Sequence, residues 1–473
     1  MNKLFSVLTA LVLCIFVLSA ADSSMLQVDK WGMLSVKSVD GMTGELVIPE
    51  TIDGITVTSI SNNAFKGCNE LTSVYIPDTV TTVNGWTFYE CEKLESVRLP
   101  EGLTEIDNRT FYKCSNLKYV NIPSSVTTIG SSAFYYCSSL EHINFPESLT
   151  KIKDSAFERC SSLREVALPA SLSSIGTYVF EYCRSLESLT VDPANTNFKA
   201  VNGVLYNSDM TRLYLCSSAC TDTHFIVPDT VTKFETFSFY DNHTVTRLTI
   251  PASVTSIADA ALRGCPLEFI EVSPDNPEFC SMDGVLYKKD AATLVRVPQN
   301  YTSSAFIIPD SVTKIGNYAF FDCAGIREIY FPASLSKIGS AIFRGCTSLE
   351  NIYVSGDNPI FLSEDGILYD REMTTLIKYP SAKASFRGSI EIPLQVKSIF
   401  NYAIDDCAGL KRVSTHPGCS LSANSFALCP DMEAVDFSGS LEEWKNVKKS
   451  SSWSSGLPAT CIVYCTDGSV GVK

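Results

Sequence analysis

The stretch LKYVNIPSSVTTIGSSAFYYCSSL, residues 117–140, carries the pattern that decides the fold. Its apolar residues Val120 and Ile122 alternate with polar ones, which is typical of a short β-strand. Pro123 follows at once, and because proline cannot donate a hydrogen bond to a sheet ladder, it ends that strand. Residues 126–129 predict a second short strand. No helical spacing persists across the stretch.

The same pattern recurs with a period of 23 residues. Successive copies open at Leu71, Leu94, Leu117, Leu140, Leu163 and Leu186. Each copy ends in Phe-x-x-Cys or a variant of it. A unit this short cannot bury its apolar stripe alone, so it must stack on its neighbours. The sequence therefore predicts a β-rich solenoid of 23-residue coils with parallel strands.

Three copies in the C-terminal half are longer and contain an insertion. The inserted segments are NGVLYNSDMTRLYLC from Asn202, DGVLYKKDAATLVRVP from Asp283 and DGILYDREMTTLIKYP from Asp365. Each joins an Asn-Gly or Asp-Gly pair to two short apolar runs, which is a hairpin signal. We therefore expect inserted β-hairpins as part of the architecture.

Composition excludes some classes of protein. The 473 residues are 45% hydrophobic and 19% charged, which gives ample material for a packed core. The formal charge is −15, and no basic run is interleaved with aromatic residues. Since nucleic-acid binding depends on such positive surface, we expect no nucleic-acid partner.

The chain begins with an early lysine, an apolar run at residues 4–18 and small residues at Ser19 and Ala21. This pattern predicts a signal peptide at residues 1–21, with a membrane anchor as the alternative interpretation. After cleavage no transmembrane segment is expected. The predicted domains are an N-terminal cap at residues 22–43, a solenoid at 44–437 and a C-terminal cap at 438–473.

Eighteen cysteines in an exported chain would ordinarily indicate a disulfide framework, but most of them occupy one coil position. One coil has Asn242 there, and asparagine shares with cysteine a small size and hydrogen-bonding capacity. The pattern predicts an internal ladder of buried, inert side chains that meet the backbone of the adjacent coil. Its members are Cys68, Cys91, Cys114, Cys137, Cys160, Cys183, Asn242, Cys265, Cys323, Cys346, Cys407 and Cys429.

The expected spacing of neighbouring coils would also allow disulfide bonds between cysteines at this position, so such bonds are an alternative to the ladder. The irregular cysteines are the better disulfide candidates: Cys216, Cys220, Cys280, Cys419, Cys461 and Cys465. Cys461 and Cys465 cannot join each other if CIVYC is a single strand.

The sequence contains few residues in arrangements typical of metal binding or catalysis. Cys216, Cys220 and His224 are the nearest approach to a metal site, but their spacing is loose and they lack a fourth ligand. Neither a nucleophile elbow nor a phosphate-binding glycine loop is present, so we expect no enzyme, metal or cofactor. Sequons at Asn108 and Asn300 are candidate glycosylation sites. The sequon at Asn242 conflicts with a buried position in the ladder.

The quoted copy resembles the leucine-rich repeats of the BspA-like surface proteins, with their pattern L-x-x-V-x-I-P-x-S-V-T-x-I-G-x-x-A-F-x-x-C-x-x-L. The D-G-V-L-Y segments and the ending from Leu441 also look like that family, and the resemblance covers about residues 44–470. It implies a curved parallel sheet and a secreted or surface-attached protein that acts in adhesion. The Asn242 coil, the shortened coil at Cys265 and the absence of a visible wall-sorting signal depart from the pattern.

Residues between the buried strand positions must face outward. The expected binding residues on this face are Tyr75, Arg98, Tyr119, Asn121, His142 and Asn144. Tyrosine and arginine are typical contact residues, so we expect an extracellular protein or glycan ligand. The alternative is a structural protein of the extracellular matrix or surface coat that acts by self-association.

Overall fold

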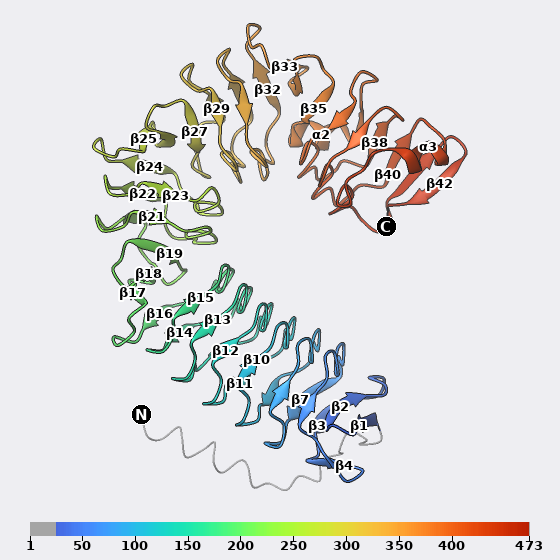
Figure 1. Cartoon of the computed structure of the whole chain (residues 1–473). Helices are drawn as coiled ribbons and strands as arrows, with labels where there is room; N and C mark the ends of the chain where they lie inside the picture. Colours follow the sequence, from blue (N-terminus) through green and yellow to red (C-terminus); the bar gives the residue numbers. More distant parts are fainter. Residues whose placement is uncertain (1–24, 473) are drawn as a thin grey trace. The chain divides into compact units, whose positions relative to one another are not determined.

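The computed structural model describes residues 25–472 (Figure 1). It divides into two compact units. The N-terminal unit runs to Ser208 and includes Ser217–Ala219, and the C-terminal unit comprises Asp209–Cys216 and the chain from Cys220 onward. The predicted signal peptide at residues 1–21 lies outside the described residues. Neither helix described in residues 25–472 has the length and apolar character that a bilayer span requires.

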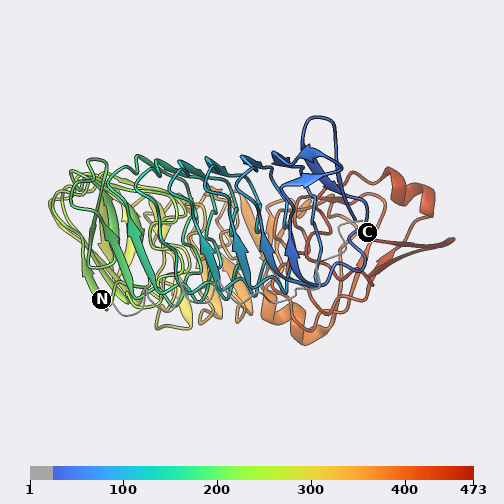
Figure 2. The same cartoon turned by 90° about the horizontal axis from the view of Figure 1, so that it is seen from below.

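In the N-terminal unit most coils contribute a longer strand and a two-residue strand, and within each sheet strands of the same kind from neighbouring coils pair in parallel. The longer strands are β3 (Gly44–Val47), β7 (Leu71–Tyr75), β9 (Ser96–Arg98), β11 (Tyr119–Asn121), β14 (Glu165–Leu168) and β16 (Ser188–Val191). The short strands are β6 (Ser59–Ile60), β8 (Thr82–Val83), β10 (Glu105–Ile106), β12 (Thr128–Ile129), β13 (Lys151–Ile152) and β15 (Ser174–Ile175). Figure 2 shows these coils, blue to green, as successive turns.

The register of these sheets reproduces the sequence period. Ser73 pairs with Ser96, which pairs with Tyr119, so each step is 23 residues. The short strands follow the same step, from Glu105 to Thr128. The predicted solenoid with parallel strands is therefore confirmed.

The regular pairing is interrupted at two places. The short strands β8 and β10 belong to separate sheets, and one coil lacks its longer strand. At His142 the expected strand is reduced to an isolated bridge with Glu165, so the strands β11 and β14 belong to separate sheets. Two antiparallel pairs lie near the start of the unit, the first before β3 and the second directly after it. These are β1 (Leu26–Val28) with β2 (Met33–Val36), and β4 (Thr51–Ile52) with β5 (Ile55–Thr56).

The C-terminal unit repeats the same two kinds of strand. The longer strands are β20 (His224–Ile226), β22 (Arg247–Ile250), β24 (Phe269–Val272), β28 (Ala305–Ile307), β30 (Glu328–Phe331), β32 (Asn351–Val354), β36 (Ser389–Glu391), β38 (Arg412–Thr415), β40 (Ala434–Phe437) and β41 (Ile462–Cys465). The short strands are β21 (Lys233–Phe234), β23 (Ser256–Ile257), β29 (Lys314–Ile315), β31 (Lys337–Ile338), β37 (Ser398–Ile399) and β39 (Ser420–Leu421).

The predicted hairpins are present, and each begins one strand earlier than the inserted segments quoted above. Their strands are β17 (Phe198–Val201), β18 (Val204–Asn207), β19 (Arg212–Cys216), β25 (Phe279–Met282), β26 (Val285–Lys288), β27 (Thr293–Arg296), β33 (Phe361–Glu364), β34 (Ile367–Asp370) and β35 (Thr375–Lys378). The turn between β17 and β18 has Asn202 and Gly203 at φ 49° and 75°. Two positive φ values favour an Asn-Gly turn, because few other pairs adopt them without strain.

Two short helices accompany the last coils. Helix α2 (Ser381–Arg387) follows β35, and α3 (Leu441–Asn446) begins with a capping box between Ser440 and Glu443. Strand β41 extends the sheet of β40 in parallel, and β42 (Gly468–Gly471) closes it as an antiparallel edge. The sequence analysis did not predict these helices.

The core of the N-terminal unit contains one phenylalanine from each coil. Their ring centroids are 5.1–5.8 Å apart, in the order Phe65, Phe88, Phe111, Phe134, Phe157 and Phe180. These are the phenylalanines of the Phe-x-x-Cys motif. The motif therefore supplies an aromatic stack in the interior of the coils. It also supplies the residues predicted as an internal ladder, from Cys68 to Cys429, which we call the cysteine column.

Candidate functional site

Four of the six predicted binding residues line one groove on the strand face of the N-terminal unit. Tyr75, Arg98, Tyr119 and Asn121 lie on β7, β9 and β11 around a groove of about 440 Å³. We call this the N-terminal groove. Tyr75 and Tyr119 are 44% and 46% exposed, so both rings present apolar surface to solvent. The strand register places Tyr75, Arg98 and Asn121 side by side in neighbouring coils.

Arg98 is held in place by its neighbours. Its guanidinium donates to the Ile76 carbonyl and to the Asp78 carboxylate, both at 2.7 Å, and lies 4.9 Å from the centre of the Tyr75 ring. The hydrogen bond from Arg98 lowers the pKa of Asp78. The arginine charge is thus paired, and the groove combines aromatic rings with amide and hydroxyl groups and with the exposed carboxylate of Glu45 at its edge.

His142 and Asn144 are exposed but do not line this groove. They lie in the coil where the strand is reduced to a single bridge. The structure therefore brings together the first four predicted residues and leaves the last two outside.

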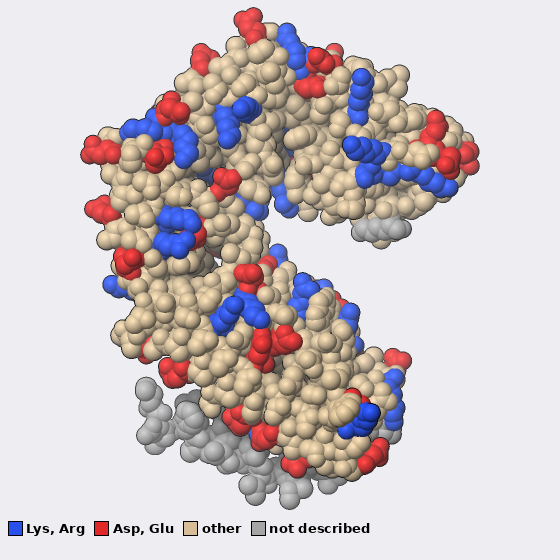
Figure 3. All heavy atoms as spheres, viewed as in Figure 1, with Lys and Arg blue, Asp and Glu red and all other residues tan. Residues whose placement is uncertain are grey.

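Charges are mixed along the coils. Many ion pairs join residues 23 positions apart, such as Lys93 to Glu70 and Lys118 to Glu95. These side chains are half exposed or more, so each pair contributes little to stability. Figure 3 shows Lys and Arg lying beside Asp and Glu over the face that it presents.

A second groove was missed by the sequence analysis. Ile307, Tyr330 and Tyr353 pair in register across β28, β30 and β32, and they line a groove of about 340 Å³ in the C-terminal unit. The two tyrosine rings stack with centroids 4.9 Å apart. We call this the tyrosine groove. The sequence did contain a signal for the tyrosine groove, because Ile307, Tyr330 and Tyr353 follow one another at 23-residue intervals.

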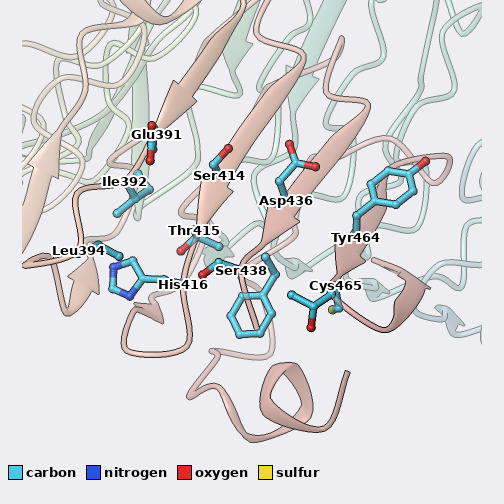
Figure 4. A pocket seen from close by; sticks show the side chains of 12 residues that line it. Glu391, Ile392, Leu394, Ser414, Thr415, His416, Asp436, Ser438, Tyr464 and Cys465 are labelled. Carbon is cyan, nitrogen blue, oxygen red and sulfur yellow. The ribbon is translucent and has the colours of Figure 1, made fainter. Parts of the chain in front are cut away.

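A third groove lies on the last sheet (Figure 4). Glu391, Ser414, Asp436 and Tyr464 stand in register on β36, β38, β40 and β41, and the groove measures about 390 Å³. Asp436 forms a two-pronged ion pair with Arg412. Aromatic and polar side chains thus recur on the strand faces of both units.

The cysteine column is buried throughout, and most of its thiols contact backbone carbonyls. Cys91, Cys114, Cys137, Cys160, Cys183 and Cys346 each lie 3.0–3.3 Å from the carbonyl of a phenylalanine 26 residues earlier. Cys323 and Cys429 contact carbonyls 25 or 26 residues earlier. The remaining members have other partners. The Cys68 thiol contacts the Met42 sulfur, and the Asn242 amide contacts the Cys216 sulfur. The Cys265 thiol contacts the Val245 carbonyl, and the Cys407 thiol contacts the Asp405 carbonyl.

Burial makes most of these thiols weak acids, whereas a hydrogen bond with Cys407 lowers the pKa of Cys429. Burial raises the pKa of Cys68, Cys265 and Cys323 to about 12. Since the thiolate is the reactive form, buried thiols of this kind are inert.

We expect native protein to leave the column cysteines unlabelled by iodoacetamide at pH 8, and denatured protein to label them without any reductant. Mass spectrometry of the two samples measures both states. Cys465, which is only partly buried, provides a matched positive control in the native sample. Column cysteines that label only after reduction would contradict the ladder and indicate bridges between coils.

The irregular cysteines form no disulfide within residues 25–472, so the structure does not support their selection as disulfide candidates. Cys216 and Cys220 are the most closely associated, because a hydrogen bond from Cys216 lowers the pKa of Cys220 to about 7. His224 contacts Thr249 at 2.9 Å, and within the described part of the chain no three His, Cys, Asp or Glu residues form a metal-ligand group.

The three sequon asparagines differ in exposure. Asn300 is exposed, Asn108 is half-buried and Asn242 is fully buried. The Asn242 side-chain oxygen accepts from the backbone of Thr244 and Val245. Glycosylation at Asn108 and Asn300 stays a prediction, and Asn242 has no room for a glycan.

Comparison with known proteins identifies one family model, described as the BspA type leucine rich repeat region, which matches residues 58–187, 211–282, 299–378 and 373–447. No curated protein matches the chain. A solved leucine rich cell surface protein from Faecalibacterium prausnitzii is 25% identical, covers 90% of this chain and 96% of its own, and has a TM-score of 0.38. A leucine-rich repeat protein from Bacteroides ovatus is 18% identical, covers 94% and 98%, and has a TM-score of 0.40.

Proposed function

Because the chain belongs to the BspA-type leucine-rich repeat family, we propose that it is a secreted or cell-surface protein that binds an extracellular protein or glycan through the strand face of its N-terminal unit. The observation that carries this proposal is the N-terminal groove, where Tyr75, Tyr119 and Asn121 meet around a firmly held Arg98. The predicted signal peptide at residues 1–21 supports export.

The chemistry of the groove favours an uncharged or weakly charged ligand surface. Exposed tyrosine rings supply apolar contact area at low entropic cost, and their hydroxyls donate and accept hydrogen bonds. The positive charge of Arg98 is already paired with Asp78, so an anionic ligand gains little from it. Sugar rings and peptide segments both offer the flat apolar patches and hydrogen-bonding groups that such a groove accepts.

Removing the groove side chains should weaken binding at least tenfold, because two exposed aromatic anchors contribute on the order of 1–2 kcal/mol each. The test screens the purified chain against arrays of neutral oligosaccharides and extracellular proteins, and then measures affinity for the best probe. The variant combines Tyr75→Ala, Tyr119→Ala and Asn121→Ala.

The matched control is Tyr330→Ala with Tyr353→Ala, which removes two exposed tyrosines at the same coil position in the tyrosine groove. Unchanged affinity in the first variant with an intact circular-dichroism spectrum would overturn the proposed site. Assembly that grows with protein concentration, without saturable binding to any probe, would instead favour the structural self-associating role.

A further inference from the structure

Lys378 and Asp405 form an ion pair in the interior of the C-terminal unit. Lys378 is the last residue of β35, and Asp405 stands in the next coil, two residues before Cys407. Their side chains are 2% and 0% exposed. The Lys378 Nζ contacts Asp405 Oδ1 directly. Two groups of opposite charge are thus held together away from water.

This pair has few other partners. An ammonium group has three donors and a carboxylate has several acceptor positions. Within residues 25–472, the Lys378 Nζ has a hydrogen bond to Asp405 Oδ1 alone, and Asp405 Oδ2 has none. Apolar side chains such as Tyr379 and Ile404 are buried beside them in sequence. A buried ion pair with so few hydrogen bonds does not recover the cost of removing its charges from water.

The equivalent position in the preceding long copy is built differently. Arg296 ends β27 as Lys378 ends β35, and it is also buried. Its guanidinium donates to the carbonyls of Tyr318 and Phe321, at 2.6 and 2.9 Å. Phe321 stands two residues before Cys323, where the later copy has Asp405. The coil therefore accepts an apolar side chain at this place, and the fold does not require the buried carboxyl.

Burial also favours the uncharged forms of both groups. It raises the pKa of the Asp405 carboxyl to about 6. Burial lowers the pKa of the Lys378 ammonium, while the Asp405 carboxylate raises it, and the net change is a rise. Once the proton has moved to the carboxylate, this raising influence is gone. A proton transferred from Lys378 to Asp405 within the pair would give a neutral amine, a nucleophile, in contact with a neutral carboxylic acid, an electrophile.

We propose that Lys378 and Asp405 condense into an intramolecular amide cross-link. The ammonium proton passes to the carboxylate, and the free amine attacks Asp405 Cγ. The C–N bond forms, the C–OH bond breaks, and the hydroxyl leaves with a proton from the nitrogen as one molecule of water. The step needs no oxidant or cofactor. Fixed proximity replaces a bimolecular encounter, and the dry surroundings oppose hydrolysis of the product.

Peptide mapping of the purified full-length chain tests this proposal. The protein is denatured, reduced, alkylated and digested, and the peptides are sequenced by tandem mass spectrometry. We expect a branched peptide that joins the segments containing Lys378 and Asp405, lighter than their sum by one water. The pair Lys383 and Asp365 serves as an internal control, because its carboxylate is 58% exposed and should stay unlinked.

Variants at the two positions identify the linked atoms. Lys378→Arg copies the residue at Arg296 and should give only linear peptides, since a guanidinium is not nucleophilic. Asp405→Asn should give the same branched product, with ammonia as the leaving group. Linear peptides covering Lys378 and Asp405 as the only products of the wild-type chain would overturn the proposal and leave a simple ion pair. This result comes from the wild-type protein, so it holds even where a variant fails to fold.

Discussion

Replacing Phe111 with alanine should lower the free energy of unfolding of the N-terminal unit by about 3–5 kcal/mol, the range for deleting a buried phenyl ring. Phe111 is fully buried, and its ring centroid lies 5.5 Å from that of Phe88 and 5.2 Å from that of Phe134. The substitution therefore removes contacts on both sides and leaves a cavity between coils. Urea unfolding followed by circular dichroism measures the change.

Two other substitutions make this result specific. Phe111→Leu keeps most of the volume and should cost clearly less than the alanine variant. Tyr119→Ala removes an aromatic ring from the surface of the neighbouring strand and should change stability by less than about 0.5 kcal/mol. A loss below about 1 kcal/mol for Phe111→Ala would show that the stack contributes little to the fold.

The second large effect is a loss of stability at alkaline pH. Burial raises the thiol pKa from 9.0 to about 12 at Cys68, and well above the ordinary value at Cys114 and Cys137. A pKa that is higher in the folded state favours the protonated folded form. The stability that a buried thiol gains from this difference is fully present below the thiol pKa of the unfolded chain. It is lost as the pH rises from that value through the thiol pKa of the folded protein. Ionisation of each of these three thiols in the unfolded chain should therefore lower the free energy of unfolding by about 1.4 kcal/mol per pH unit above pH 9.

This prediction is measured as the slope of unfolding free energy against pH between pH 9 and pH 11. Tyrosine and lysine also titrate in this range, so the informative quantity is the difference between wild type and the double variant Cys114→Ala/Cys137→Ala. The double variant lacks two of the buried thiols, so its unfolding free energy should fall less steeply with pH than that of the wild type. Equal slopes would mean that these thiols ionise as readily in the folded protein as in the unfolded chain.

The sequence predicted the fold because its signals were repeated. A single copy such as residues 117–140 is a weak indication of two short strands, but the same spacing at Leu71 and Leu94 makes chance improbable. The hairpins were predicted for the same reason, since Asn202, Asp283 and Asp365 each precede a glycine in a similar context. Helices α2 and α3 occur once each, so the comparison of copies could not reveal them.

The candidate site was less predictable, because it depends on where the regular pattern is interrupted. Tyr75, Arg98, Tyr119 and Asn121 share a groove because β7, β9 and β11 belong to one sheet. Periodicity assigned His142 the same outward position, but it does not show that pairing is reduced to a bridge in that coil. The contact between Lys378 and Asp405 joins residues in neighbouring coils, and the alternating pattern of a single strand carries no signal for it.

The constant step of 23 residues in the strand register also bears on how such a chain changes in evolution. Each regular coil of the N-terminal unit presents the same backbone polar groups, phenyl ring and thiol to the coil before it and the coil after it. A duplication or deletion of one whole copy in the gene would thus restore every one of these contacts at the new junction. Unequal recombination can lengthen or shorten the array in whole coils, and so alter the extent of the surface without redesigning the interior.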